Sequence, residues 1–154
     1  MIMDERLEFA KDVAVSGGTG SVYFGDTIDL GPNRDISGSD KCPLFLCIQV
    51  TATGAGAGTV GFELYTGSGV ADGSGHIAGG AEIVQATRVK AASTYGVGEY
   101  IVIPIPQENS EQTYKRYLQM SVRRANASTL LKVSAWINFG YPKHKAYKDA
   151  DNAG

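Results

Sequence analysis

The sequence predicts an all-β fold, and three observations support this prediction. First, apolar residues occupy every second position of residues 43–51, which is the period of a strand buried on one face. The residues on this predicted buried face are Leu44, Leu46, Ile48 and Val50. Second, no stretch of the chain shows a helical repeat that compares with this alternation. Third, 20 of the 154 residues are glycine, as expected for a fold with many turns and long loops.

Composition bounds the fold and excludes several classes of function. A chain of 154 residues fits one domain. At this length about 70% of the surface of the unfolded chain becomes buried on folding, so the core needs no disulfide bonds or metal ions for its stability. The net charge of −2 argues against a domain devoted to nucleic acid, which is normally strongly basic. The charged N-terminus lacks the apolar centre of a signal peptide, and no apolar run reaches the ~20 residues of a membrane helix. We therefore expect a soluble protein made in the cytoplasm.

The two cysteines, Cys42 and Cys47, are predicted to be free thiols. In an extended chain their Cα atoms lie about 16 Å apart, whereas a disulfide requires a separation of at most ~7 Å. Two cysteines without further ligands are also too few for a structural zinc site. We expect Cys47 to lie on a packed face of the sheet.

Residues 1–12 are predicted to form a charged N-terminal arm. Its apolar residues, Ile2, Leu7 and Phe9, are irregularly spaced. Two interpretations stay open. One or two of these residues pack against the body of the same chain, or the arm docks on a neighbouring molecule.

The body, residues 13–141, is predicted to contain about eight strands separated by turn signals. We expect them at residues 13–15, 21–30, 43–51, 60–65, 83–89, 100–105, 115–123 and 129–139. The second strand requires an irregularity at Gly25 and Asp26, because a straight strand would bury Asp26 beside Phe24 and Ile28. We therefore expect a bulge or tight turn at this point.

A polar corner at residues 34–40 comes before the third strand. Since no other chemistry accompanies its charged residues, they are best explained as groups that fix the corner. We expect Arg34 to pair with a nearby carboxylate, Asp29 or Asp35 being the closest in sequence.

The middle of the chain combines a clear strand with a glycine-rich segment. Val60, Phe62 and Leu64 alternate with a second set that includes Tyr65. Residues 54–80 hold ten of the twenty glycines, and residues 67–80 are predicted to form a long loop. The strand at 83–89 is weaker, and the apolar strand at 100–105 contains Pro104, which indicates an edge strand or a strand end.

The last two strands have regular alternation and form a hairpin. Leu118, Met120 and Val122 share one face of the first of them. In the second, one face is formed by Leu131, Val133, Ala135 and Ile137. Trp136 is therefore expected to point outward. The polar tail, residues 142–154, is expected to be disordered in isolation.

Eight short strands without a helix predict two packed sheets, as a jelly roll or another Greek-key β-sandwich. Few residues offer catalytic or metal chemistry within this fold. The two histidines, His76 and His144, lie in the glycine-rich loop and in the tail. No zinc, phosphate-binding or GxSxG motif occurs. We therefore predict no metal site, no cofactor and no catalytic residue, and expect a binding or structural module rather than an enzyme.

Four parts of the chain carry a family resemblance. They are the charged lead with Phe9 and residues 12–15; the IDLG run of 28–31 followed by RDI at 34–36; the strand of 43–51; and residues 103–104 with the RYLQ strand of 116–119 and the final strand of 132–137. In pattern and spacing these parts resemble the capsid decoration proteins, or cement proteins, of tailed bacteriophages. The glycine-rich segment and the tail depart from the family's pattern.

The resemblance implies a structural viral protein that binds the outer surface of an icosahedral phage head and bridges capsid subunits. It implies a jelly-roll fold with no catalytic residues to carry over. The partner would be the major capsid protein, and the chain would form a homo-oligomer without contacting nucleic acid or membrane. The protein would be synthesised in the host cytoplasm and end on the capsid surface of the virion.

We expect the capsid contacts to come from Ile2, Leu7 and Phe9 in the arm and from Trp136 and Tyr141 near the end of the body. An outward-facing Trp136 requires a partner, which makes it a candidate anchor. The alternative is that Trp136 packs under a loop or the tail of its own chain.

Two other functions stay open. A carbohydrate-binding or host-attachment module on the virion surface would stack sugars on outward aromatic rings such as Tyr65, Tyr117 and Trp136. A small jelly-roll enzyme of the cupin type is a third possibility, and the lack of a histidine cluster argues against it.

Overall fold

The computed structural model confirms the predicted all-β class. It describes residues 7–15, 19–31, 43–53, 58–70, 74–78, 81–87, 89–106, 114–125 and 131–139. Within these residues the chain forms antiparallel strands and no α-helix, apart from the 3-10 turn η2 (Ala92–Thr94).

Each predicted strand has a counterpart among the longer strands. These are β1 (Glu8–Val15), β2 (Gly20–Asp29), β3 (Leu44–Ala52), β4 (Thr59–Gly67), β7 (Glu82–Ala86), β9 (Tyr100–Pro104), β10 (Tyr117–Arg124) and β11 (Leu131–Phe139). Three short strands were not predicted, namely β5 (Gly69–Val70), β6 (Ile77–Ala78) and β8 (Lys90–Ala91). The paired strands β5 and β6 lie in the predicted loop of residues 67–80, so part of that segment is an ordered hairpin.

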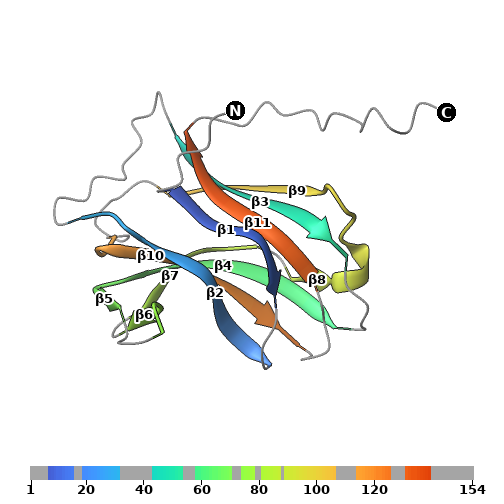
Figure 1. Ribbon diagram of the computed structural model, residues 1–154, viewed down its shortest axis with the longest axis horizontal. Helices are drawn as coiled ribbons and strands as arrows, with labels where there is room; N and C mark the ends of the chain where they lie inside the picture. The colour runs from blue at the N-terminus through green and yellow to red at the C-terminus, as the bar shows by residue number, and fades with distance from the viewer. Residues whose placement is uncertain are drawn as a thin grey trace.

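The longer strands form two antiparallel sheets that lie on top of each other (Figure 1). The first sheet has the order β1-β11-β3-β9. The second sheet has the order β2-β10-β4-β7, and β8 also pairs with β4. The described part of the chain is thus a β-sandwich, with β1 beside β2 along one side and β9 near β7 along the other.

The core fills the space between the sheets, and strand alternation explains which residues enter it. The hydrophobic core cluster includes twelve fully buried residues of the four central strands, namely Leu46, Ile48, Val50, Val60, Phe62, Leu64, Leu118, Met120, Val122, Leu131, Val133 and Ala135. Every one of them occupies the face that alternation assigns to the interior. The intervening residues therefore point to the outer faces of the two sheets.

The predicted irregularity in β2 is a β-bulge. Ile28 pairs with Leu118 and Phe24 with Met120, so three residues of β2 lie opposite the single residue Gln119 of β10. The bulge leaves Asp26 exposed, as the sequence required.

Gly25, within this bulge, is the point where β2 comes closest to β1. Its φ of +69° lies in the left-handed region that favours glycine. A Cβ at this position would overlap the carbonyl oxygen of Phe9 in β1. The missing side chain therefore allows the two sheets to approach along this side of the sandwich.

Strand β1 differs from the prediction because it begins at Glu8 and not at residue 13. Its pairing with β11 is interrupted by register shifts, which hide its alternation in the sequence. At the second shift Asp12 has a positive φ of 51°. The Asp12 N–H donates to Ser134 Oγ at 2.9 Å, and its carboxylate accepts from Thr51 Oγ1 at 2.6 Å. These bonds fix the irregular turn of the backbone.

Replacing Gly25 by alanine is expected to lower the free energy of unfolding by about 3 kcal/mol, because backbone strain adds to the overlap with Phe9. Gly31→Ala is the matched control. Gly31 also has a positive φ, of 78°, but nothing lies within 4 Å of the point that its Cβ would occupy. This variant should lose only about 1 kcal/mol. Urea unfolding of both variants measures the difference, and equal losses would contradict the close contact.

Candidate functional site

The predicted contact residues do not form one exposed surface in the described structure. Phe9 is fully buried in the core, and Leu7 is half-buried and packs against it. The expectation that Phe9 projects from an arm is therefore wrong, and the alternative that it packs against its own chain is correct. Ile2 and Tyr141 lie outside the described residues.

Trp136 lies on the outer face of the first sheet, as predicted, but it is not exposed. Only 4% of the residue is accessible, and its ring makes an edge-to-face contact with Tyr100, 5.6 Å between centroids. Between them lies Cys47, the cross-strand partner of Trp136. The prediction of a free, packed thiol is confirmed for Cys47, whose pKa is raised to about 11 by burial. Cys42 lies outside the described residues.

Phe139 is the exposed aromatic residue that the sequence did not single out. It ends β11, and 63% of it is accessible. Glu8 pairs with Trp136, so the start of β1 and the end of β11 lie together. We call this place, marked by Leu7 and Phe139, the terminal end of the first sheet. The segments before residue 7 and after residue 139, which contain Ile2 and Tyr141, both join the body there.

A cluster of polar and aromatic residues occupies the outer face of the second sheet. Its members, here called the outer-face cluster, are Ser21, Tyr23, Glu63, Tyr65, His76, Gln119 and Ser121. Tyr23 in β2 and Tyr65 in β4 meet edge to face across β10, with ring centroids 5.3 Å apart. Glu63, almost fully buried, accepts hydrogen bonds from Ser21 Oγ at 2.8 Å and from Tyr65 OH at 3.2 Å.

The environment of the cluster changes its titration. Burial, and to a lesser extent the Glu63 carboxylate, raises the pKa of Tyr23. Burial is also the largest cause that raises the pKa of Tyr65. Because both pKa values are raised, Tyr23 and Tyr65 remain neutral hydrogen-bond donors at physiological pH.

Ser121 Oγ, on the same face of β10, is buried and makes no hydrogen bond within the described residues.

The β5–β6 hairpin covers one side of the cluster. Ile77 packs over Gly67, where a Cβ would overlap the Ile77 side chain. The Ile77 N–H donates to Gln119 Oε1 at 2.7 Å, so the Gln119 amide group turns its nitrogen toward His76 Nδ1. The hairpin thus brings His76 from the glycine-rich segment to the sheet. Cross-strand neighbours of this kind are not visible in the sequence.

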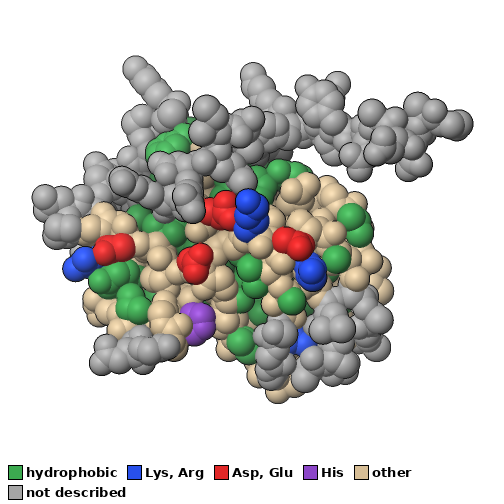
Figure 2. Space-filling model, viewed as in Figure 1, with side chains coloured by type: hydrophobic (Ala, Val, Ile, Leu, Met, Phe, Trp, Pro, Cys, Tyr) green, Lys and Arg blue, Asp and Glu red, His purple; other side chains and the backbone are tan. Residues whose placement is uncertain are grey.

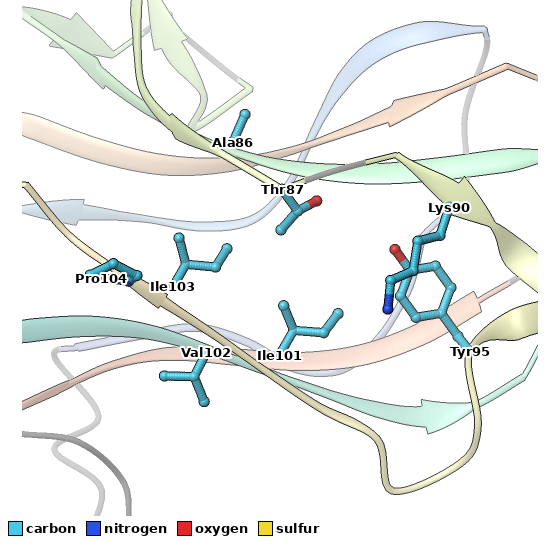
Figure 3. A pocket seen from close by; sticks show the side chains of 8 residues that line it. All are labelled: Ala86, Thr87, Lys90, Tyr95, Ile101, Val102, Ile103 and Pro104. Carbon is cyan, nitrogen blue, oxygen red and sulfur yellow. The ribbon is translucent and has the colours of Figure 1, made fainter.

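A cavity of about 250 Å³ opens between the two sheets at the side opposite β1 and β2. Strand β9 and the segment from β7 to the 3-10 turn line it (Figure 3). Its lining residues are Ala86, Thr87, Lys90, Tyr95, Ile101, Val102, Ile103 and Pro104. The Lys90 ammonium lies 5.5 Å from the centre of the Tyr95 ring and 3.4 Å from Glu99. The cavity is therefore apolar with one charged end.

Asp29, in the IDLG run of residues 28–31, forms an ion pair that the sequence did not predict. Arg116 Nε and Nη2 donate to its two carboxylate oxygens at 2.8 and 2.7 Å. The Gly31 N–H adds a third bond at 2.8 Å. With Arg116 as the first cause, these bonds lower the pKa of Asp29 to about 2. The predicted partner, Arg34, lies outside the described residues.

Opposite charges lie beside each other on the face shown in Figure 2. The ion pairs within the described residues are Asp12–Lys132, Asp29–Arg116, Glu82–Lys115 and Glu99–Lys90. Among the same residues, no group of three or more His, Cys, Asp or Glu side chains could hold a metal ion. In the part of the chain that the structure describes, no helix is long and apolar enough to span a membrane.

Comparison with known proteins gives no assignment. The chain matches no protein-family model, and no curated protein is significantly similar to it. The resemblance to capsid decoration proteins therefore stays a prediction from the sequence.

Asp29→Asn is expected to reduce stability only above the pH at which Asp29 titrates. An unfolded aspartate has a pKa of about 3.9, and the folded value is lower, about 2. The ion pair with Arg116 therefore stabilises the fold fully above about pH 4 and loses this effect as the pH falls toward 2. Urea midpoints of wild type and variant, measured from pH 6 to pH 2, should converge at the acid end.

Asp26→Asn is the control for this titration, because Asp26 lies in the same strand and forms no ion pair within the described residues. Since no ion pair is lost in this variant, its urea midpoint at pH 6 should differ little from that of wild type. A difference for Asp29→Asn that does not depend on pH would exclude the ion pair as its cause.

Proposed function

We propose that the chain is a jelly roll that serves as a non-enzymatic decoration protein on the outer surface of an icosahedral phage head. The strand order supports the jelly-roll part of this proposal. Counted in chain order, the eight longer strands give 1-8-3-6 in the first sheet and 2-7-4-5 in the second. Two Greek keys wound together have this order, and the fold recurs in viral capsid and lectin domains.

The observation that most supports a binding role is the exposed Phe139 at the terminal end. An accessible aromatic ring at the end of a long, paired strand is a rigid anchor for a partner. The terminal segments with the predicted contact residues Ile2 and Tyr141 join the body at the same place. We propose that this end of the first sheet, with Phe139, is the part of the molecule that contacts the capsid.

The physical role follows from this arrangement. A protein that binds two capsid subunits at once favours the assembled shell over its separated subunits by mass action. Each contact can be weak, because contacts presented on one rigid body act as if they were linked. The major capsid protein is the proposed partner, and the chain acts on the virion after its synthesis in the host cytoplasm.

Phe139→Ala tests the proposed anchor. We expect it to lower the occupancy of purified expanded heads by at least about ten-fold at limiting concentration, as loss of an aromatic anchor typically costs about 2 kcal/mol or more. Val97→Ala is the control, because Val97 is also strongly exposed, but in a loop away from the terminal end. Trp136→Ala is not suitable, since loss of the buried Trp136 side chain would perturb the fold.

The number of copies in purified virions tests the function itself. Hundreds of copies are expected for a shell component, whereas a handful would place the chain in the tail or a fibre. A chain that does not bind heads at any concentration would contradict the proposal, whatever the effect of Phe139.

A carbohydrate-binding role on the virion surface is the second candidate, and the outer-face cluster favours it. The Tyr23 and Tyr65 rings are partly accessible, and Glu63 and Gln119 supply hydrogen-bonding groups beside them. Aromatic rings next to a few polar groups are a usual setting for a sugar ring.

If the cluster binds sugars, a glycan array should give binding that Tyr23→Ala weakens by at least about ten-fold. Phe139→Ala is the control, because Phe139 is an exposed aromatic residue of the first sheet and lies outside the cluster. Array binding without affinity for heads would favour this function over the first. No binding to any glycan would exclude it.

A further inference from the structure

Among the described strands, β9 is an edge of the first sheet, since the strand order ends with it. The hydrogen bonds at its two ends show which residues face the neighbouring strand β3. Ile105 N–H donates to Leu44 O at 2.9 Å, and Val50 N–H donates to Glu99 O at 3.0 Å. In an antiparallel pair the direction of the main-chain groups alternates. The N–H and C=O groups of Tyr100 and Val102, and the C=O of Pro104, therefore point away from β3.

The space beside this edge is the cavity described above. In the part of the chain that the structure describes, strands β9 and β7 are not paired across it, and the Gln85 side chain reaches between them, with Nε2 donating to Pro104 O at 3.2 Å. Ile101 and Ile103 project from β9 into the space, whereas Val102 points to the other side (Figure 3). At about 250 Å³ it exceeds the ~150 Å³ of an engineered cavity that binds benzene. A strand added to the edge could place aliphatic side chains there.

The edge is poorly protected against such pairing. Natural edge strands are usually blocked by charged residues, proline or bulges. β9 has the sequence Tyr-Ile-Val-Ile-Pro, without a charge, and only Pro104 at its end interrupts the row of donors. Its sequence is also nearly symmetric about Val102, because isoleucine stands on both sides of it.

We propose that β9 pairs with β9 of a second copy of the chain, antiparallel, around a two-fold axis at Val102. The axis joins the two first sheets into one continuous sheet. Val102 and the partner's Val102 each donate an N–H to the other's carbonyl oxygen. Tyr100 N–H donates to the carbonyl oxygen of the partner's Pro104, which has a second lone pair beside the bond from Gln85.

Side chains agree with this register. On the inner side Ile101 lies opposite the partner's Ile103, and β-branched pairs of this kind stabilise neighbouring strands. These isoleucines fill the mouths of the two cavities, so each copy supplies the apolar groups that complete the other. No charged residue of β9 meets a like charge, since the strand carries none and Lys90 at the cavity's end is paired with Glu99.

The near symmetry of the strand is what selects a second copy rather than an unrelated strand. Pro104, which has no N–H, falls opposite Tyr100 at each end of the pair, where the missing donor leaves one carbonyl of each copy, that of Tyr100, to solvent. The dimer does not depend on capsid binding by the terminal end. It can be tested on the purified full-length chain alone.

Charge variants at residue 102 test the two-fold axis. Sedimentation equilibrium of wild type should give twice the chain mass of 16.3 kDa. Val102→Glu and Val102→Lys should each weaken self-association by about 30-fold or more, because the axis places two like charges opposite each other. An equimolar mixture of the two variants should restore the dimer, since only residue 102 facing residue 102 brings the opposite charges together.

Ile83→Glu is the matched control, since Ile83 lies on β7, an edge strand of the second sheet in the described structure, and is half accessible. This variant should remain dimeric. Circular dichroism and thermal unfolding verify that each variant is folded. Amide exchange of the wild-type chain gives a measurement without variants, and the Val102 N–H should become protected as the concentration rises.

Several results would overturn the proposal. They are a wild-type mass of 16.3 kDa at every concentration, an unchanged dimer of folded Val102→Glu, a mixture that stays monomeric, and a Val102 N–H that exchanges freely in the dimer. Loss of the dimer in Ile83→Glu would place the contact on β7 and not on β9.

Discussion

The close approach of β1 and β2 at Gly25 determines the shape of the sandwich. With no side chain at this position, the backbone of the second sheet reaches the Phe9 carbonyl of the first. The bulge that contains Gly25 also turns Asp26 out to solvent, so the approach does not bury a charge. One side of the sandwich is therefore closed by backbone contact, and the opposite side, between β7 and β9, remains open as a cavity. Because of this asymmetry, the edge strand β9 lies beside the apolar lining of the cavity, where Ile101 is partly accessible.

Both outer faces of the sandwich carry buried side chains of their own. On the first sheet Trp136 and Tyr100 enclose Cys47, and on the second sheet the tyrosine pair covers Ser121 and the Glu63 carboxylate. Groups that looked available for partners are thus already used in packing. The terminal end with Phe139 and the β9 edge stay accessible in the described structure, and the decoration and dimer proposals rest on them.

Local periodicity was sufficient to predict the long strands, but it did not predict which side chains are covered by residues remote in the sequence. The alternation of residues 43–51 identified the buried face of β3, and the position of Asp26 required the bulge in β2. Phe9 was misplaced because register shifts in β1 break the alternation that would have revealed its strand. Trp136 was assigned to the correct face, yet its burial depends on Tyr100, which is remote in sequence and two strands away. Asp29 was considered only as one of two carboxylates close in sequence to Arg34, whereas Arg116 reaches it across the β2–β10 pair.

The pairing of β1 with β11 joins the first described strand of the chain to the last. β11 also pairs with β3, so among the described strands it alone connects the two halves of the first sheet. During synthesis, β1 and β3 must wait for β11 to leave the ribosome before either can complete its hydrogen bonds. Folding dominated by such remote pairings is slow and leaves apolar strands exposed for longer. A chain truncated before β11 would therefore lose the centre of the first sheet, and it should be recovered as an aggregate rather than as a shortened domain.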